Sequence, residues 1–193
     1  LKLFNLQSPL FGKGGSIRKA MSLGNGNYFI IFDPDLEYTI EDAWTAYRQA
    51  KTQKHQMVLA SRLLKKDPVY RYFFNYIGVK FLTTIINILF RQKLTDTATA
   101  TKILDAAAYK KINLTCTGFD LDFQLVTRIA RAGGVISEVH GEYSPRSIAQ
   151  GKKIRPIVDG CQSLLAIVKD RLVSKNLIMS ACDTTGSLYD QAL

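Results

Sequence analysis

The sequence has few of the side chains that most often bind zinc or form disulfides. Its three cysteines, Cys116, Cys161 and Cys182, are widely spaced and odd in number. They form neither a disulfide framework nor a CxxC metal motif, which favours a reducing compartment. Two histidines, His55 and His140, are too few for a histidine-rich metal site and make a His-based catalytic triad improbable.

The composition is that of a folded, basic protein. Of the 193 residues, 47% are hydrophobic and 22% are charged, which excludes an intrinsically disordered chain. We expect one domain over residues 1–180, followed by a polar tail at 181–193. The formal net charge of +10 is compatible with three partners: nucleic acid, an anionic membrane surface or phosphorylated small molecules.

Apolar runs alternate with helical patterns along the chain, which predicts an α/β fold with a parallel sheet. Strands are expected at residues 27–32, 57–60 and 135–139. Helices are expected at residues 12–24, 39–50, 105–111, 120–132 and 159–172. Thr39 and Asp42 have the spacing of a capping box at the start of the second helix.

Residues 69–92 form the most apolar and aromatic part of the sequence. The length approaches a membrane span, but Lys80 lies at the centre and Gly78 divides the segment. Two short amphipathic helices lying at a bilayer surface fit this pattern. A helical hairpin in the core of a soluble protein fits it equally well.

Three carboxylates follow the first predicted strand at alternating positions: Asp33, Asp35 and Glu37. Ligands of open α/β sheets bind beyond the carboxyl ends of the strands. Carboxylates placed there can hold Mg²⁺ or Mn²⁺, which in turn neutralises a diphosphate. The alternative is a solvated acidic turn that is bent by Pro34.

Other groups have a chemical and a plain structural interpretation. Backbone N–H groups of residues 12–15, with Lys13, suit a phosphate at a helix N-terminus, or they form a turn. Asp96, Asp120 and Asp122 are candidate general bases, although Asp120 also suits a helix N-cap. The basic candidates for phosphate binding, each of which could instead be a solvated cation, are Arg62, Arg71, Arg146, Lys152 and Lys153.

The order of the motifs resembles one glycosyltransferase family. The motifs are GKGGSIRKAM, YFIIFDPDLEYTIED, LASR, LTDTATATK, TGFDLDFQL and EYSPRSIAQGKKI. Together they resemble the family 2 glycosyltransferases, specifically the dolichyl-phosphate mannose synthase-like, or polyprenyl-phosphate sugar transferase, branch. The resemblance covers residues 11–172.

This resemblance implies a GT-A (Rossmann-like) fold and an inverting transfer of sugar from a GDP- or UDP-linked donor to polyprenyl phosphate. It implies a peripheral enzyme at the cytoplasmic face of a membrane, with residues 69–92 as a pair of interface helices. The implied metal ligands are Asp33, Asp35 and Glu37. The implied donor-phosphate residues are Lys13, Arg62, Arg146, Lys152 and Lys153. The implied acceptor-phosphate residues are Arg71 and Asn75, and the implied catalytic acids are Asp35, Asp96, Asp120 and Asp122.

The sequence departs from the family pattern in three places. Ala98 stands where a second acid usually follows Asp96, and Asp120 and Asp122 replace a glutamate pair. Eleven residues precede Gly12, where the family has the first half of its nucleotide-binding fold, so an N-terminally truncated fold is expected. A non-catalytic remnant or a membrane-associated interaction module is therefore the alternative. Nucleic-acid binding is disfavoured because no known motif occurs and the aromatic residues are not interleaved with the basic ones.

Overall fold

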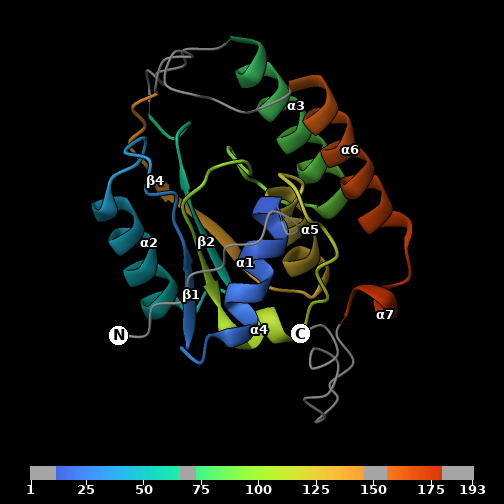
Figure 1. The fold of residues 1–193 in the computed structure, drawn as a ribbon, viewed down its shortest axis with the longest axis horizontal. Helices are drawn as coiled ribbons and strands as arrows, with labels where there is room; N and C mark the ends of the chain where they lie inside the picture. Colours follow the sequence, from blue (N-terminus) through green and yellow to red (C-terminus); the bar gives the residue numbers. More distant parts are fainter. Residues whose placement is uncertain (1–11, 66–72, 146–155, 180–193) are drawn as a thin grey trace.

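The protein folds around a four-stranded mixed sheet. The computed structural model describes residues 12–65, 73–145 and 156–179. The strands lie in the order β1–β3–β2–β4 (Figure 1). Their bounds are Tyr28–Ile31 for β1, Met57–Ser61 for β2, Lys102–Asp105 for β3 and Ile136–His140 for β4.

Strand β3 corrects the expectation of a purely parallel sheet. It pairs antiparallel with both β1 and β2, whereas β2 and β4 are parallel. The sequence pattern missed β3 because four residues beginning with Lys102 are too short to show a strand period. The carboxyl ends of β1, β2 and β4 consequently meet the amino end of β3 at one edge, which we call the carboxyl edge.

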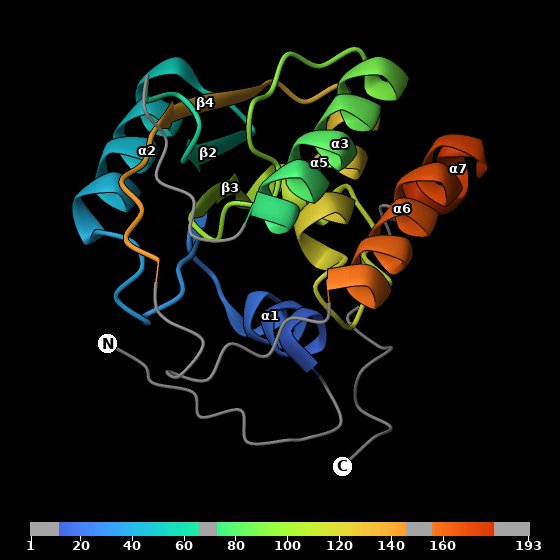
Figure 2. The same cartoon turned by 90° about the horizontal axis from the view of Figure 1, so that it is seen from above.

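Seven helices are described: α1 (Gly12–Leu23), α2 (Ile40–Gln53), α3 (Phe73–Phe90), α4 (Ala106–Lys110), α5 (Leu121–Arg131), α6 (Pro156–Leu172) and α7 (Lys175–Ile178). Helix α2 covers one face of the sheet, and α1 and α5 lie on the other, with α3 and α6 outside α5 (Figures 1 and 2). A hydrophobic core lies on each face of the sheet, and alternate residues of β2 contribute to each. Met57 and Leu59 face the core on the side of α5, and Val58 and Ala60 face the core on the side of α2.

Helix α3 corrects the expected pair of interface helices. It runs without interruption through Gly78, where an added Cβ would have no neighbour within 4 Å. Leu82 and Ile86 are buried against the core, whereas Phe73 and Phe81 are mostly exposed. The helix is therefore amphipathic, with an apolar outer side. None of the helices in the described part of the chain has the length and apolarity to cross a membrane.

The predicted capping box also proves wrong, although the helix that it marks is present. Thr39 is the N-cap of α2, but its side chain makes no capping hydrogen bond. The Asp42 carboxylate instead accepts a hydrogen bond from the backbone N–H of Glu142, at 2.8 Å. Asp42 thus ties α2 to the segment that follows β4, a long-range contact that the local sequence pattern cannot reveal.

Candidate functional site

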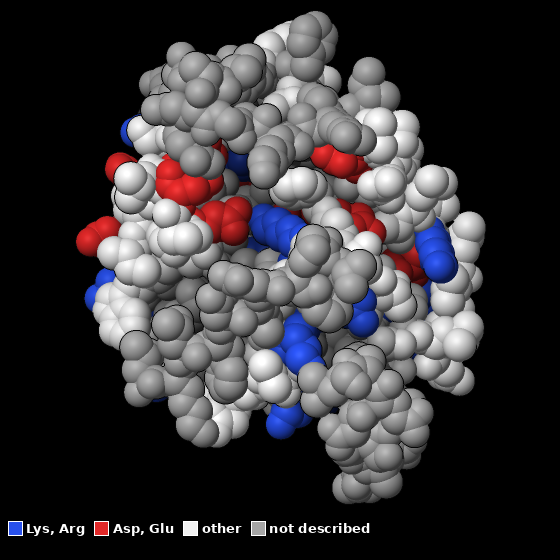
Figure 3. All heavy atoms as spheres, viewed as in Figure 1, with Lys and Arg blue, Asp and Glu red and all other residues white. Residues whose placement is uncertain are grey.

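Polar side chains from four parts of the chain, three of them charged, gather at the carboxyl edge. Asp33 follows β1, Arg62 follows β2, Tyr143 follows β4 and Asp96 precedes β3. In the space-filling view, acidic side chains collect near this edge with basic side chains beside them (Figure 3). These residues lie close together because β3 begins at the same edge of the sheet at which β1, β2 and β4 end.

The glycine-rich start of α1 packs against the chain before α5. The backbone N–H groups of Gly14 and Gly15 both donate to the carbonyl oxygen of Thr117, at 2.9 and 3.3 Å. A Cβ on Gly14 would lie 2.9 Å from the carbonyl carbon of Thr117, so this close approach requires glycine. These two N–H groups serve the fold and do not form the expected phosphate cradle.

The same approach places Lys13 between two carboxylates. Its Nζ lies 3.1 Å from Oδ2 of Asp33 and 3.6 Å from Oδ2 of Asp122. It also lies 5.6 Å from the ring centroid of Phe119. Burial disfavours the charged ammonium, but the carboxylates of Asp122 and Asp33 outweigh that effect and raise the pKa of Lys13. Lys13 therefore stays a cation at the end of β1.

Lys102 continues this chain of charges into the protein interior. Its side chain is fully buried, and its Nζ lies 2.8 Å from Oδ1 of Asp122. It also donates to the carbonyl oxygen of Thr99. Burial opposes ionisation of Asp122, but Lys102 and Lys13 overcome it and lower the pKa of that carboxyl. Asp122 is therefore the anion shared by the two lysines.

Arg62 and Asp96 form a second charged unit at the edge. The Nε and Nη2 atoms of Arg62 donate to the two Asp96 oxygens, at 2.5 and 2.7 Å, and the Arg62 backbone N–H donates to Oδ2 at 3.2 Å. This is the bidentate geometry of a strong arginine–carboxylate pair. Asp96 has no solvent exposure, so its carboxylate reaches the edge only through Arg62.

The loop that carries Asp96 is fixed from two sides. The carboxylate of Glu138, on β4, accepts the backbone N–H groups of Thr95 and Asp96, at 2.8 to 2.9 Å. On the side of α3, Asn87 pairs with both backbone groups of Leu94, at 2.7 and 2.9 Å. Hydrogen bonds therefore connect α3 to the carboxyl edge through this loop, and they restrict the position of Asp96.

Tyr143 connects this unit to the acidic turn. Its hydroxyl donates to Oε2 of Glu37 at 3.2 Å, and its ring lies 5.2 Å from the guanidinium carbon of Arg62. Burial, together with the nearby Glu37 carboxylate, raises the pKa of Tyr143 well above the usual range. The phenol thus remains a hydrogen-bond donor to Glu37.

The acidic turn supplies suitable metal ligands without a complete cage. Oδ1 of Asp35 accepts the backbone N–H of Glu37 at 3.1 Å, and Leu36 between them has a left-handed φ of 64°. Within residues 12–65, 73–145 and 156–179, no three His, Cys, Asp or Glu side chains converge as a metal site. Mg²⁺ is commonly held by one or two carboxylates completed by substrate phosphates and water. Asp33 and Asp35 fit that type of site.

The remaining predicted residues fall into two groups. Asp120 accepts the backbone N–H of Gly118 at 3.0 Å and makes no capping bond to α5, so it closes the preceding turn. Asn75 lies in the first turn of α3 and is partly exposed. Four predicted phosphate-binding residues lie outside the described residues: Arg71, Arg146, Lys152 and Lys153.

Sequence reasoning missed three residues that organise the edge. Lys102 carried no signal because its strand was not recognised. Glu138 is the one acidic residue of strand β4, whose sequence is ISEVH. A single carboxylate within a predicted strand was the signal that could have marked it as a functional or structural residue. Tyr143 lay in a quoted motif, but only its contacts with Glu37 and Arg62 assign it a role.

Comparison with known proteins identifies the fold. No protein-family model matches the sequence, and no curated protein matches it. Glucosyl-3-phosphoglycerate synthase from Mycobacterium tuberculosis, solved with Mn²⁺, UDP and phosphoglyceric acid, superposes with a TM-score of 0.62 at 11% identity. That match covers 84% of this chain and 55% of the other.

A second enzyme gives the same result. Mannosyl-3-phosphoglycerate synthase from Rubrobacter xylanophilus has a TM-score of 0.60 at 12% identity, covering 89% of this chain and 54% of the other. The chain therefore spans just over half the length of these two enzymes. It has the GT-A fold of nucleotide-sugar transferases, as the sequence predicted.

Proposed function

We propose that this protein transfers a sugar from a nucleotide-diphosphate sugar to a phosphate-bearing acceptor. The observation that carries the proposal is the gathering of Lys13, Asp33 and the Arg62–Asp96 pair at the carboxyl edge of a GT-A fold. In open α/β sheets, this edge is where ligands bind. One of the two structural relatives, glucosyl-3-phosphoglycerate synthase, was solved with Mn²⁺, UDP and phosphoglyceric acid, which supports a nucleotide-sugar donor for this fold.

The donor diphosphate would lie over the end of β1. Mg²⁺ or Mn²⁺ bound by Asp33 and Asp35 would supply positive charge to offset the leaving diphosphate. Lys13 is already a cation beside Asp33, so its ammonium can turn from the carboxylate to a phosphate oxygen. Glu37 is held by Tyr143 and would orient the turn in place of a third ligand.

The Arg62–Asp96 pair serves orientation in this proposal. The Asp96 carboxylate is buried and is held by the guanidinium and the backbone N–H of Arg62, so it is poorly placed to exchange protons with solvent. A phosphate acceptor is anionic near neutral pH and needs little help from a general base. We assign Arg62 to align phosphate groups, and Asp96 to fix the plane of its guanidinium.

For the acceptor, we propose polyprenyl phosphate at a membrane surface, with Asn75 and Arg71 as its phosphate contacts. The support is the outer side of α3, where Phe73, Ile77 and Phe81 are exposed, while Asn75 lies in the first turn of the same helix. An amphipathic helix of this kind can lie in the headgroup region with its apolar side in the lipid. Arg146, Lys152 and Lys153 are proposed to contact the donor phosphates.

The test is a transfer assay with labelled GDP-linked and UDP-linked hexoses. One arm offers polyprenyl phosphate in detergent micelles, and the other offers phosphoglycerate, the acceptor named for the structural relatives. Product that requires Mn²⁺ or Mg²⁺, and that is lost in Asp35→Asn but kept in Glu41→Gln on exposed α2, supports transfer. Product only with phosphoglycerate rejects the lipid acceptor, and no product in either arm favours a non-catalytic role.

A further inference from the structure

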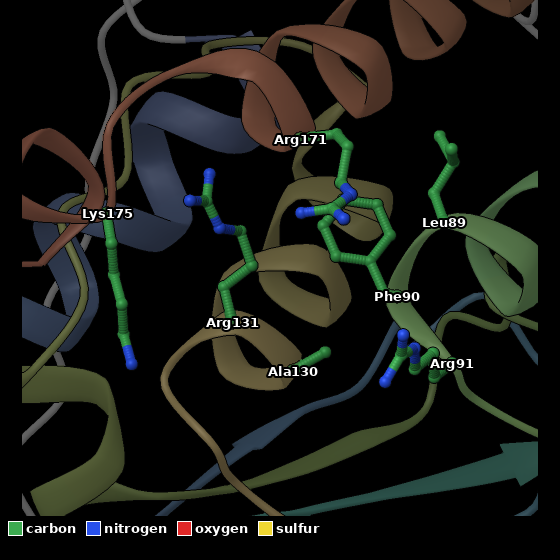
Figure 4. Close-up of a pocket in the computed structure, with 7 residues that line it drawn as sticks. All are labelled: Leu89, Phe90, Arg91, Ala130, Arg131, Arg171 and Lys175. Atoms are coloured by element: carbon green, nitrogen blue, oxygen red, sulfur yellow. The ribbon is translucent and has the colours of Figure 1, made fainter.

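A second concave site lies among the ends of four helices. It is a solvent-open cavity of about 320 Å³ between α3, α5, α6 and α7 (Figure 4). Its lining residues are Leu89, Phe90, Arg91, Ala130, Arg131, Arg171 and Lys175. We call it the basic pocket, because four of these residues are cationic and none is acidic.

Three of the cations have no carboxylate partner among the described residues. None of the ion pairs found there includes Arg91, Arg171 or Lys175, and all three side chains are exposed. The adjacent carboxylate, Asp170, is buried and paired with Arg128 at 3.0 Å. The basic pocket therefore has a surplus of positive charge that the described structure does not neutralise.

Stabilisation of helix ends accounts for only part of this surplus. Cations are favourable near helix C-termini, where carbonyl oxygens lack partners. Arg131 has that role, because it donates to the carbonyl oxygens of Asp170 and Val173, the latter at 2.7 Å. Among the side-chain hydrogen bonds of the described residues, Arg131 makes these two contacts with a helix end, whereas Arg91 and Arg171 make none. Both remain available to an external ligand.

The basic pocket is distinct from the proposed transfer site. Asn75, in the first turn of α3, and Arg91, which directly follows α3, are sixteen positions apart. At the helical rise per residue, that separation is about 24 Å. No residue of the carboxyl edge lines the pocket. An acceptor phosphate beside Asn75 therefore cannot also contact Arg171 and Lys175.

We propose that the basic pocket binds a phosphate-bearing anion. Guanidinium groups suit phosphate because their paired N–H donors match its oxygens, and Lys175 adds a point charge. Figure 4 shows side chains from four different helices bordering one space. The exposed residues Ile88 and Leu172 are neighbours in sequence of the lining residues Leu89 and Arg171, and Leu177 is exposed on α7, so the phosphate can belong either to a lipid headgroup or to a soluble compound.

Two binding arms distinguish these sources without any sugar transfer. Calorimetry with inorganic pyrophosphate measures the soluble source. Sedimentation with phosphatidylcholine vesicles, with and without phosphatidic acid, measures the lipid source. The test variant is Arg171→Gln with Lys175→Gln. The matched control is Arg48→Gln with Lys51→Gln on α2, which removes the same two charges from exposed positions on the other face of the sheet.

We expect the test variant to weaken at least one of the two interactions by about tenfold or more, since each lost contact is a hydrogen bond to a charged group. The control should retain wild-type affinity. Loss of pyrophosphate binding identifies a soluble source, and loss restricted to phosphatidic acid vesicles identifies a lipid. Equal weakening in both variants, no weakening, or no binding by the wild type would overturn the proposal. Thermal unfolding of both variants confirms that they are folded.

Discussion

Two ion pairs that are connected by the contact between Lys13 and Asp122 have the same chemistry but different surroundings. Lys102 and Asp122 form the inner pair, with side-chain exposures of 0% and 8%. Lys13 and Asp33 form the outer pair, with exposures of 20% and 38%. The inner pair joins β3 to α5, and the outer pair joins α1 to the end of β1. The difference indicates that the inner pair maintains the architecture, whereas the outer pair can exchange partners.

The largest effect should follow from breaking the inner pair. Lys102→Met leaves Asp122 buried without its nearest cation, which should cost about 3–5 kcal/mol in the free energy of unfolding. Urea or guanidinium unfolding measures this loss. Replacing both partners, by Lys102→Met with Asp122→Leu, should recover most of the stability. A single variant within about 1 kcal/mol of wild type would contradict an architectural role for the pair.

The Arg62–Asp96 pair is a second buried ion pair, in which the cation is an arginine instead of a lysine. Asp96→Asn removes the buried anion while nearly preserving shape, so Arg62 loses its charge partner. We expect a loss of about 3 kcal/mol. Glu41→Gln on α2 removes an exposed carboxylate and should change unfolding by less than about 0.5 kcal/mol. Equal effects of the two substitutions would show that the Asp96 carboxylate does not organise the edge.

The inner pair also predicts an acid dependence of stability. Because the pKa of Asp122 is lowered in the fold, its contribution is complete above the unfolded value of about 3.9. It is lost as the pH falls through the folded value. Two lysines face Asp122: Lys13, whose pKa is raised by the neighbouring carboxylates, and Lys102, whose pKa is lowered by burial. The Lys102→Met, Asp122→Leu double variant should therefore lose less stability than wild type between pH 5 and 2.

If the free energy of unfolding depends on pH in the same way for wild type and the double variant, the stability lost in acid comes from other carboxylates. Urea unfolding at closely spaced pH values gives the comparison, since each profile then reports the difference in protons bound by the folded and unfolded states. Thermal unfolding in the same buffers provides an independent check.

The outer pair should affect ligand binding more than stability. Lys13→Gln should change the free energy of unfolding by less than about 1 kcal/mol, because this pair is partly exposed. Removing the ammonium should strengthen Mn²⁺ binding to the turn, since Asp33 then has no competing cation. Electron paramagnetic resonance of free Mn²⁺ measures that change. Unchanged or weaker Mn²⁺ binding would argue against a metal role for Asp33.

Strong local patterns made most of the fold predictable. The apolar run before Asp33 and the helices on either side of it were recognised from sequence, because each element is consistent over many residues. Strand β3 was missed because four residues carry no period. The break expected at Gly78 was wrong because the flanking apolar residues continue to pack on one side of α3.

The site was predictable in its residue types and less so in its pairings. Asp33 and Lys13 were both identified, but as separate ligands for a metal and a phosphate, whereas they contact each other. Arg62 and Asp96 are 34 positions apart, and only the antiparallel entry of β3 brings them together. Long-range contacts of this kind depend on topology, which local patterns do not specify.

The most direct test of the central claim is nucleotide binding at the carboxyl edge. Calorimetric titration of UDP and of GDP, each with Mn²⁺, should give saturable binding of one nucleotide to the wild type and to Glu41→Gln. Asp33→Asn should weaken that binding by about tenfold or more, because one charged contact is lost. Binding of neither nucleotide, or equal binding by Asp33→Asn and wild type, would contradict a donor site at the end of β1.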